Sequence, residues 1–178
     1  VFIPALILGV INGAKVTIVL TLFCSGMVQW WMAKLLKIGL IPRLWSALFA
    51  VTGVFLAARM DVGLVPLILS IVSVTFVIPA GLNVFLQHSD SSVGILGIAI
   101  GLAVLSGQGY LQLVLLFSVI PGFILFLWEN GKISWRNIKR LSTAGVIGIL
   151  TAGVLLVPLA NFWSSFRKDI DPYFSSTQ

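Results

Sequence analysis

The sequence predicts an all-α protein, a polytopic bundle of about six transmembrane helices without a sheet. Hydrophobic residues make up 59% of the chain and charged residues only 9%, and the mean hydropathy is +1.13. A soluble domain is about 25% charged, so this composition excludes an ordinary water-soluble surface. The apolar residues fall in runs long enough to cross a bilayer, where backbone groups must be hydrogen-bonded within helices. We therefore expect a multi-pass protein, integral to the cytoplasmic (plasma) membrane.

Six apolar runs follow one another along residues 1–160, the predicted transmembrane helical domain. Consecutive runs are separated by a short break that contains Gly, Pro or charged residues, which are the usual stop signals of helices. The expected spans are residues 13–36, 43–58, 64–86, 93–107, 110–128 and 141–160. The expected breaks are Gly39–Pro42, Asp61–Gly63, His88–Ser92, Gly107–Gly109 and Glu129–Lys139.

Two of these spans are short for a membrane crossing. Residues 43–58 and 93–107 give only about 22 to 24 Å of helix, against a hydrocarbon core about 30 Å thick. We expect them to lie beside longer neighbours, facing a water-filled recess or thinned bilayer. Gly94, Gly97 and Gly101 share one face of the second short span. Because small residues let helices approach closely in lipid, this face is expected to pack against another helix.

The two ends of the chain differ from its middle. Val1 to Ile11 is expected to be the end of an earlier apolar element or an interfacial segment, and the chain is expected to be a processed form or a fragment. Residues 161–178 mix polar, aromatic and charged side chains. They are expected to form an extracytoplasmic tail or the start of a further domain.

The basic residues predict the orientation in the membrane. Seven of the eleven lie beside the first and fifth breaks, and the positive-inside rule places such loops in the cytoplasm. These seven are Lys34, Lys37, Arg43, Lys132, Arg136, Lys139 and Arg140. The other four, expected outside, are Lys15, Arg59, Arg167 and Lys168. This bias explains the net charge of +6, so membrane lipids and other membrane subunits are the expected partners and nucleic acid is not.

Polar side chains in or near hydrocarbon are costly and therefore mark the candidate binding residues. Arg59 has a planar guanidinium that suits phosphate oxygens, and the alternative is an exposed ion pair with Asp61. Gln108 and Gln112 either hydrogen-bond a sugar or headgroup or cap helix ends. Lys15 lies one turn inside the first span, where its side chain either reaches the outer interface or contacts a ligand.

Known catalytic and metal-binding patterns are missing from the sequence. One His and one Cys give no metal-ligand spacing, so no metal site is predicted and the cofactor is unknown. There is no Walker lysine loop, HExxH, CxxC or GxSxG motif. Acidic residues are also missing from the centres of the predicted spans, which argues against a proton-coupled transporter.

Several segments occur in an order that resembles a known family. They are Trp31–Gly39 at the end of a long span, Leu40–Arg43 after it, the small-residue-rich Leu48–Leu56, the corner Arg59–Gly63, Val65–Leu67 and the corner Leu105–Gln112. In this order they resemble the membrane core of the GT-C glycosyltransferase superfamily, particularly its YfhO-like bacterial and archaeal members. The resemblance is one of pattern and covers about residues 13–160.

The resemblance implies a transferase that uses a polyprenyl-phosphate-linked sugar at the outer membrane face. The catalytic base of the family is an acidic residue in the first outer loop, and that loop is expected to lie outside this chain. Arg59, Gln108 and Lys15 would then be supporting residues that bind substrate or lipid phosphate. Asp61 would be the substitute candidate for the catalytic acid. The position of Leu64 is a His in many relatives, so contacts at that corner depart from the family pattern.

Two other functions remain open. The first is a non-catalytic structural or accessory subunit of a membrane complex, whose helices bind lipid, pigment or partner subunits. The second is a lipid or solute transporter, which similar halves of the chain would favour. Comparing residues 13–86 with residues 93–160 reveals no such similarity.

Overall fold

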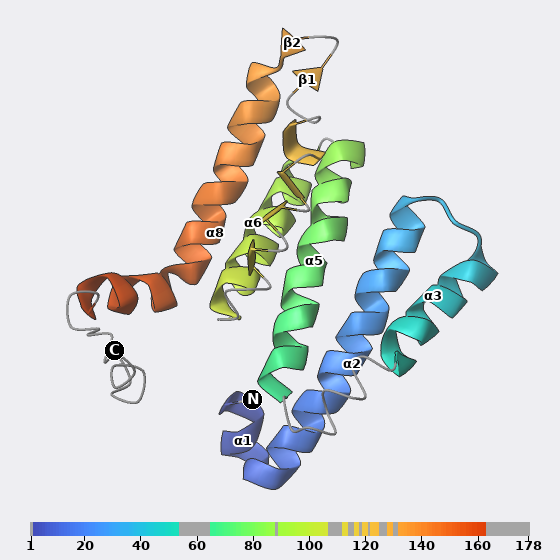
Figure 1. Cartoon of the computed structure of the whole chain (residues 1–178), viewed down its shortest axis with the longest axis vertical. Helices are drawn as coiled ribbons and strands as arrows, with labels where there is room; N and C mark the ends of the chain where they lie inside the picture. The colour runs from blue at the N-terminus through green and yellow to red at the C-terminus, as the bar shows by residue number, and fades with distance from the viewer. Residues whose placement is uncertain are drawn as a thin grey trace, which may run out of the picture.

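The structure is a computed structural model and describes residues 2–53, 65–87, 89–106, 112–113, 116–117, 119–120, 122–124, 128–129 and 132–162. The described part is helical, which confirms the predicted all-α class (Figure 1). The helices are α1 (Phe2–Leu8), α2 (Val10–Leu35), α3 (Leu40–Thr52), α5 (Val65–Gln87), α6 (Asp90–Leu105) and α8 (Trp135–Phe162). The strands β1 (Trp128–Glu129) and β2 (Lys132–Ile133) form one minimal antiparallel pair, which the sequence did not predict.

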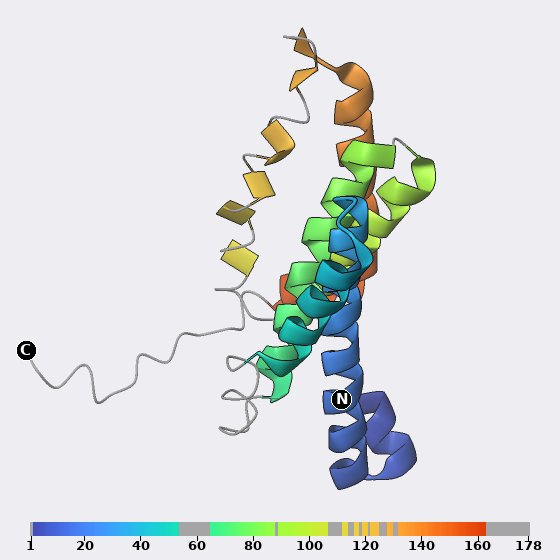
Figure 2. The same ribbon diagram turned by 90° about the vertical axis from the view of Figure 1, so that its right-hand side faces the viewer.

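Five helices stand side by side in one layer, in the order α3, α2, α5, α6 and α8. Helix α2 packs against both α3 and α5, while α6 packs against both α5 and α8. Figure 1 shows this row face on, and the edge-on view in Figure 2 shows the same helices within a narrow band. Helix α1 packs against α2. The spatial order therefore differs from the chain order, because α3 lies at the outer edge and α5 returns to the other side of α2.

The most buried core lies between α5 and α6. Val77, Ala80 and Val84 of α5 are buried together with Leu96 and Ala99 of α6. Ala80, Leu96 and Ala99 have no exposed surface. Helix α6 is thus held inside the layer, between α5 and α8, although it is one of the shorter helices.

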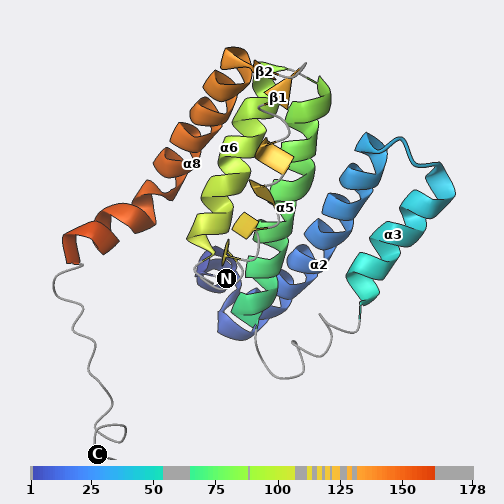
Figure 3. The ribbon, with the colours of Figure 1, turned by 45° about the horizontal axis from the view of Figure 1, so that its top comes forward.

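The short helical pieces between residues 112 and 124 lie across one face of the layer. They line a recess together with α5 and α6, and the Phe123 ring centroid lies 6.5 Å from that of Phe85 on α5. Figure 3 shows these pieces in front of α5 and α6. The span expected at 110–128 is described only in these pieces, so a continuous helix there stays a prediction.

Helices α6 and α8 begin earlier than expected. Their first residues are Asp90 and Trp135, so the breaks expected at His88–Ser92 and Glu129–Lys139 are partly helical. An acidic residue is favourable in a first helical turn, and Arg and Lys are good helix formers. A drop in hydropathy marks where a segment leaves hydrocarbon, and a helix can continue beyond that point.

The first two helix boundaries follow from one Gly and one Pro. Gly9 has φ +80°, a left-handed conformation that glycine adopts without a Cβ penalty, and it separates α1 from α2. The expected apolar segment Val1 to Ile11 therefore contains all of α1 and the first residues of α2. Helix α3 begins at Leu40 because Pro42 falls in the first turn, where its missing N–H breaks no helical hydrogen bond.

Three described helices are long and apolar enough to cross a membrane. They are Val10–Leu35, Leu67–Gln87 and Trp135–Phe162. Helices α3 and α6 are apolar but have only 13 and 16 residues. The described helices thus indicate a membrane protein. Three of them are long enough to span a membrane, against the six spans expected.

Glycine permits the close approach of α6 and α8. A Cβ at Gly97 would lie 2.6 Å from the Cβ of Ile147, and a Cβ at Gly101 would lie 2.5 Å from that of Thr151. The predicted packing face is therefore confirmed at two of its three glycines. A Cβ at Gly94 would meet nothing within 4 Å, so this glycine does not serve helix packing.

The basic residues predicted to share one side of the membrane lie at one end of the layer. Helices α2 and α5 end there, and α3, α6 and α8 begin there, at the top of Figure 1. This end carries Lys34, Lys37, Arg43, Lys132, Arg136, Lys139 and Arg140. Lys15, in the second turn of α2, lies towards the opposite end. The fold thus allows the predicted charge asymmetry, and the cytoplasmic location of the basic end stays a prediction.

Candidate functional site

Of the predicted binding residues Arg59, Gln108 and Lys15 and the catalytic candidate Asp61, only Lys15 lies in the described part of the chain. Its side chain is exposed on α2. Arg59, Asp61 and Gln108 lie outside the described residues, so their roles stay predictions. The expected tail is described only as far as Phe162, the last residue of α8.

Gln112 caps the end of α6. Its side-chain amide nitrogen donates hydrogen bonds to the carbonyl oxygens of Ala103 and Val104, both at 2.9 Å. The last carbonyls of a helix have no partner within the helix, so these bonds satisfy two of them. Of the two roles considered for this glutamine, the structure favours the helix cap over a contact with sugar or headgroup.

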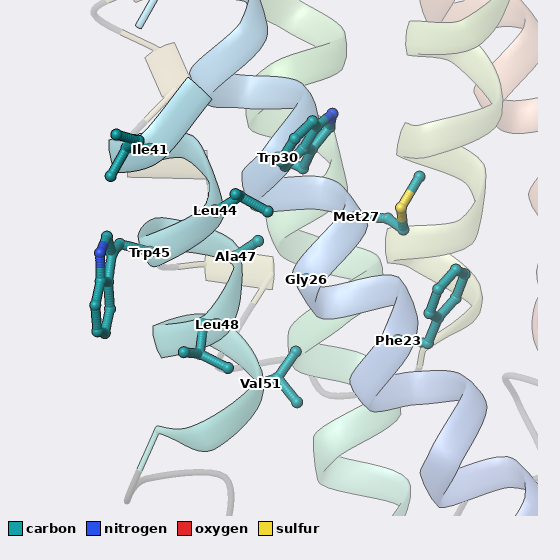
Figure 4. Close-up of a pocket in the computed structure, with 10 residues that line it drawn as sticks. All are labelled: Phe23, Gly26, Met27, Trp30, Ile41, Leu44, Trp45, Ala47, Leu48 and Val51. Carbon is teal, nitrogen blue, oxygen red and sulfur yellow. The ribbon is translucent and has the colours of Figure 1, made fainter. Parts of the chain in front are cut away.

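The candidate site is an apolar groove of about 570 Å³ between α2 and α3 (Figure 4). Its lining residues share one property, because every side chain is apolar or aromatic. They are Phe23, Gly26, Met27, Trp30, Ile41, Leu44, Trp45, Ala47, Leu48 and Val51. A groove of this composition offers dispersion contacts along its length and few directional contacts, which suits a hydrocarbon chain.

Gly26 sets the depth of the groove. A Cβ at this position would lie 2.9 Å from Cγ2 of Val51 and 3.5 Å from the carbonyl oxygen of Ala47. Figure 4 shows Ala47 and Val51 pointing from α3 towards α2 at this glycine. The Ser25 hydroxyl also donates a hydrogen bond of 3.3 Å to the carbonyl oxygen of Ala50. These contacts join the two helices at the floor and leave the larger side chains on the walls.

The walls of the groove are exposed. The exposed fraction is 62% for Phe23, 69% for Ile41 and 54% for Trp45. Burial of such a side chain away from water is worth about 1.5–3 kcal/mol, so several exposed together are strongly unfavourable in water. The same surface is compatible with hydrocarbon. We infer that lipid or another apolar chain covers this groove.

A cation lies beside the groove at the basic end of the layer. The guanidinium of Arg43 lies 5.2 Å from the ring centroid of Trp30, one of the lining residues. Its Nη2 donates a hydrogen bond of 2.7 Å to the carbonyl oxygen of Ile38. A cation over an aromatic face is an attractive arrangement. The sequence does not predict this contact of Arg43 with Trp30, because it depends on how α3 folds back along α2.

Other recesses in the described part are more polar or lie elsewhere in the layer. One of about 630 Å³ lies between α2 and α5 and includes Thr17, Thr21, Cys24 and Ser73. The hydroxyls of Thr17 and Thr21 donate to the carbonyl oxygens of Gly13 and Thr17, both at 2.7 Å. Among the described residues, no three His, Cys, Asp or Glu side chains lie close enough together to hold a metal ion.

Comparison with protein-family models, curated proteins and solved structures finds no match to this chain. The resemblance to GT-C glycosyltransferases therefore stays a prediction from the order of sequence segments.

Proposed function

We propose that this chain is a lipid-binding module of an integral membrane protein, and that the α2–α3 groove holds the apolar chain of a lipid. The observation that carries this proposal is the wholly apolar lining of the groove, joined to a cation at one end. A lipid with an anionic headgroup has the same division into an apolar chain and a charged end. Arg43 would then lie near the headgroup, and Gly26 would lie beneath the chain.

The proposed membrane arrangement has six spans and a cytoplasmic basic end in the plasma membrane. It is supported by three long apolar helices and by the seven basic residues gathered at one end of the layer. Helices α3 and α6 would serve as short spans beside longer neighbours, since α3 packs on α2 and α6 packs on α5 and α8. Short helices of this kind are accommodated by thinning of the bilayer or by protein contacts.

Glycosyl transfer from a polyprenyl-phosphate-linked sugar is the second candidate function. The apolar groove favours it, because such a donor needs a surface for its long isoprenoid chain. The residues proposed to act on the phosphate and sugar are Arg59, Gln108, Lys15 and Asp61. A non-catalytic subunit would use the same groove for membrane lipid without acting on it.

Photo-crosslinking in membranes tests the proposed lipid binding and separates the two candidates. The probes are a diazirine-bearing polyprenyl phosphate and a diazirine-bearing phosphatidylglycerol, and labelled peptides are mapped by mass spectrometry. We expect label to concentrate on residues 23–30 and 41–51, compared with the exposed apolar residues Val146 and Val154 of α8. Stronger labelling by polyprenyl phosphate would favour the transferase. Labelling that simply follows exposure along all helices would rule out a specific groove.

A further inference from the structure

A second recess, distinct from the α2–α3 groove, lies between the first turns of α6 and α8. Its volume is about 590 Å³. It is lined by Asp90, Val93, Gly94, Trp135, Arg136, Lys139, Arg140, Thr143 and Ile147. The recess belongs to the basic end of the layer, where both helices begin. It adjoins the α6–α8 packing contact, because Ile147 both lines the recess and contacts Gly97.

The charge of this recess is predominantly positive. Three cationic side chains and one carboxylate line it. Arg136 and Lys139 are exposed, so they are accessible to a ligand from the bulk or from the membrane surface. The N-terminal turns of α6 and α8 add to the positive potential, because their first N–H groups have no partner within the helix. The recess therefore favours an anion over a cation or a neutral polar molecule.

The floor of the recess is apolar. Val93 and Gly94 come from α6 and Ile147 from α8. A Cβ at Gly94 would meet nothing within 4 Å, so this glycine leaves open space that helix packing does not use. A ligand that fits both parts has an anionic group at the mouth and hydrocarbon on the floor.

An aromatic side chain marks the mouth of the recess. The Trp135 side chain is 67% exposed, and Nζ of Lys139 lies 5.9 Å from its ring centroid. Tryptophan and lysine together are typical of the level of lipid headgroups, where the ring is partly in hydrocarbon and the cation meets phosphate. The recess thus has the composition of an interfacial site.

We propose that the recess between the first turns of α6 and α8 binds the phosphate of an anionic phospholipid, with Arg136 and Lys139 at the phosphate and the beginning of an acyl chain over Gly94. Basic pockets between transmembrane helices are suited to anionic headgroups. This proposal rests on a different recess from the α2–α3 groove, so either can fail without the other. Free inorganic phosphate shares the anionic chemistry but has no use for the apolar floor.

Lipid binding to the full-length chain in nanodiscs tests this proposal. Spin-labelled phosphatidylglycerol is the probe in a phosphatidylcholine bilayer, and the double variant R136Q/K139Q is compared with K34Q/K37Q. The control removes the same charge from exposed residues at the same end of the layer, outside this recess. Because each basic residue near an anionic lipid surface is worth about 1 kcal/mol, R136Q/K139Q should weaken binding about 30-fold. The control should retain most of the binding.

The outcomes are distinguishable. Equal weakening by both double variants would overturn the proposal, because the effect would then come from net charge alone. Displacement of the lipid probe by inorganic phosphate alone would also overturn it and assign the recess to a free anion. Gly94→Leu gives a check that leaves the charge unchanged. It should weaken lipid binding at this recess without changing thermal stability, and unchanged binding would exclude the apolar floor from the site.

Discussion

Replacing Gly97 or Gly101 by leucine is expected to force α6 and α8 apart and to produce the largest loss of stability of any single change considered. The new Cβ would lie 2.6 Å from the Cβ of Ile147 or 2.5 Å from that of Thr151. Both neighbours are β-branched at the clashing carbon. The new Cβ would also lie close to a backbone carbonyl oxygen of α8, at 2.9 Å for Gly97 and 3.1 Å for Gly101. The contact therefore cannot be relieved by moving the end of a flexible side chain.

The expected cost is about 3 kcal/mol for each glycine, the upper end of the usual cost of overpacking. Thermal denaturation of the detergent-solubilised protein, followed by circular dichroism, measures it. Gly145→Leu is the matched control, because a Cβ at Gly145 of α8 would meet nothing within 4 Å. An equal loss of stability in all three variants would mean that α6 and α8 do not pack through these glycines.

Replacing Gly26 by leucine is expected to remove lipid from the α2–α3 groove. The new side chain would start from the floor of the groove, 2.9 Å from Cγ2 of Val51, and fill the space that a chain would occupy. We expect the crosslinking yield of photoreactive lipid on residues 41–51 to fall about tenfold, equivalent to about 1.4 kcal/mol. The loss of stability should be smaller than at Gly97, since the nearest atom is a side-chain methyl group.

A control for this variant is Gly153→Leu on α8. A Cβ at Gly153 would meet nothing within 4 Å, so leucine there adds the same hydrocarbon without filling a groove. It should leave the crosslinking yield on residues 41–51 unchanged. An unchanged yield in Gly26→Leu would show that lipid does not occupy the floor of the groove.

The sequence was most informative about helices and least informative about their ends. Long apolar runs predicted the helices at 13–36 and 64–86, where α2 and α5 are found. The start of α8 at Trp135 was missed because its first turns are basic, and hydropathy does not distinguish a basic helix from a basic loop. The strand pair at residues 128–133 was missed because two-residue strands have no hydrophobic period.

The candidate site could not be predicted from the sequence in the same way. Arg43 was predicted to lie on the cytoplasmic side, but its contact with Trp30 depends on α3 folding back along α2. The sequence around Gly26 did not indicate its role, because that role is a close contact with Val51, which is 25 residues away in the chain. In contrast, the spacing of Gly97 and Gly101 on one helical face was sufficient to predict packing, although not the partner helix.

The orientation of the chain in the membrane is the most direct measurement to make. Cys24 is the single cysteine, so Cys24→Ala gives a background in which one introduced cysteine reports one position. We expect Ser134→Cys, beside the first turn of α8, to resist a membrane-impermeant maleimide in intact cells and to react once the membrane is opened. Asn12→Cys, at the other end of α2, should react in intact cells. Labelling of Ser134→Cys from outside would contradict a basic end in the cytoplasm. Release of the protein from the membrane by alkaline extraction, with neither position labelled, would contradict a multi-pass protein.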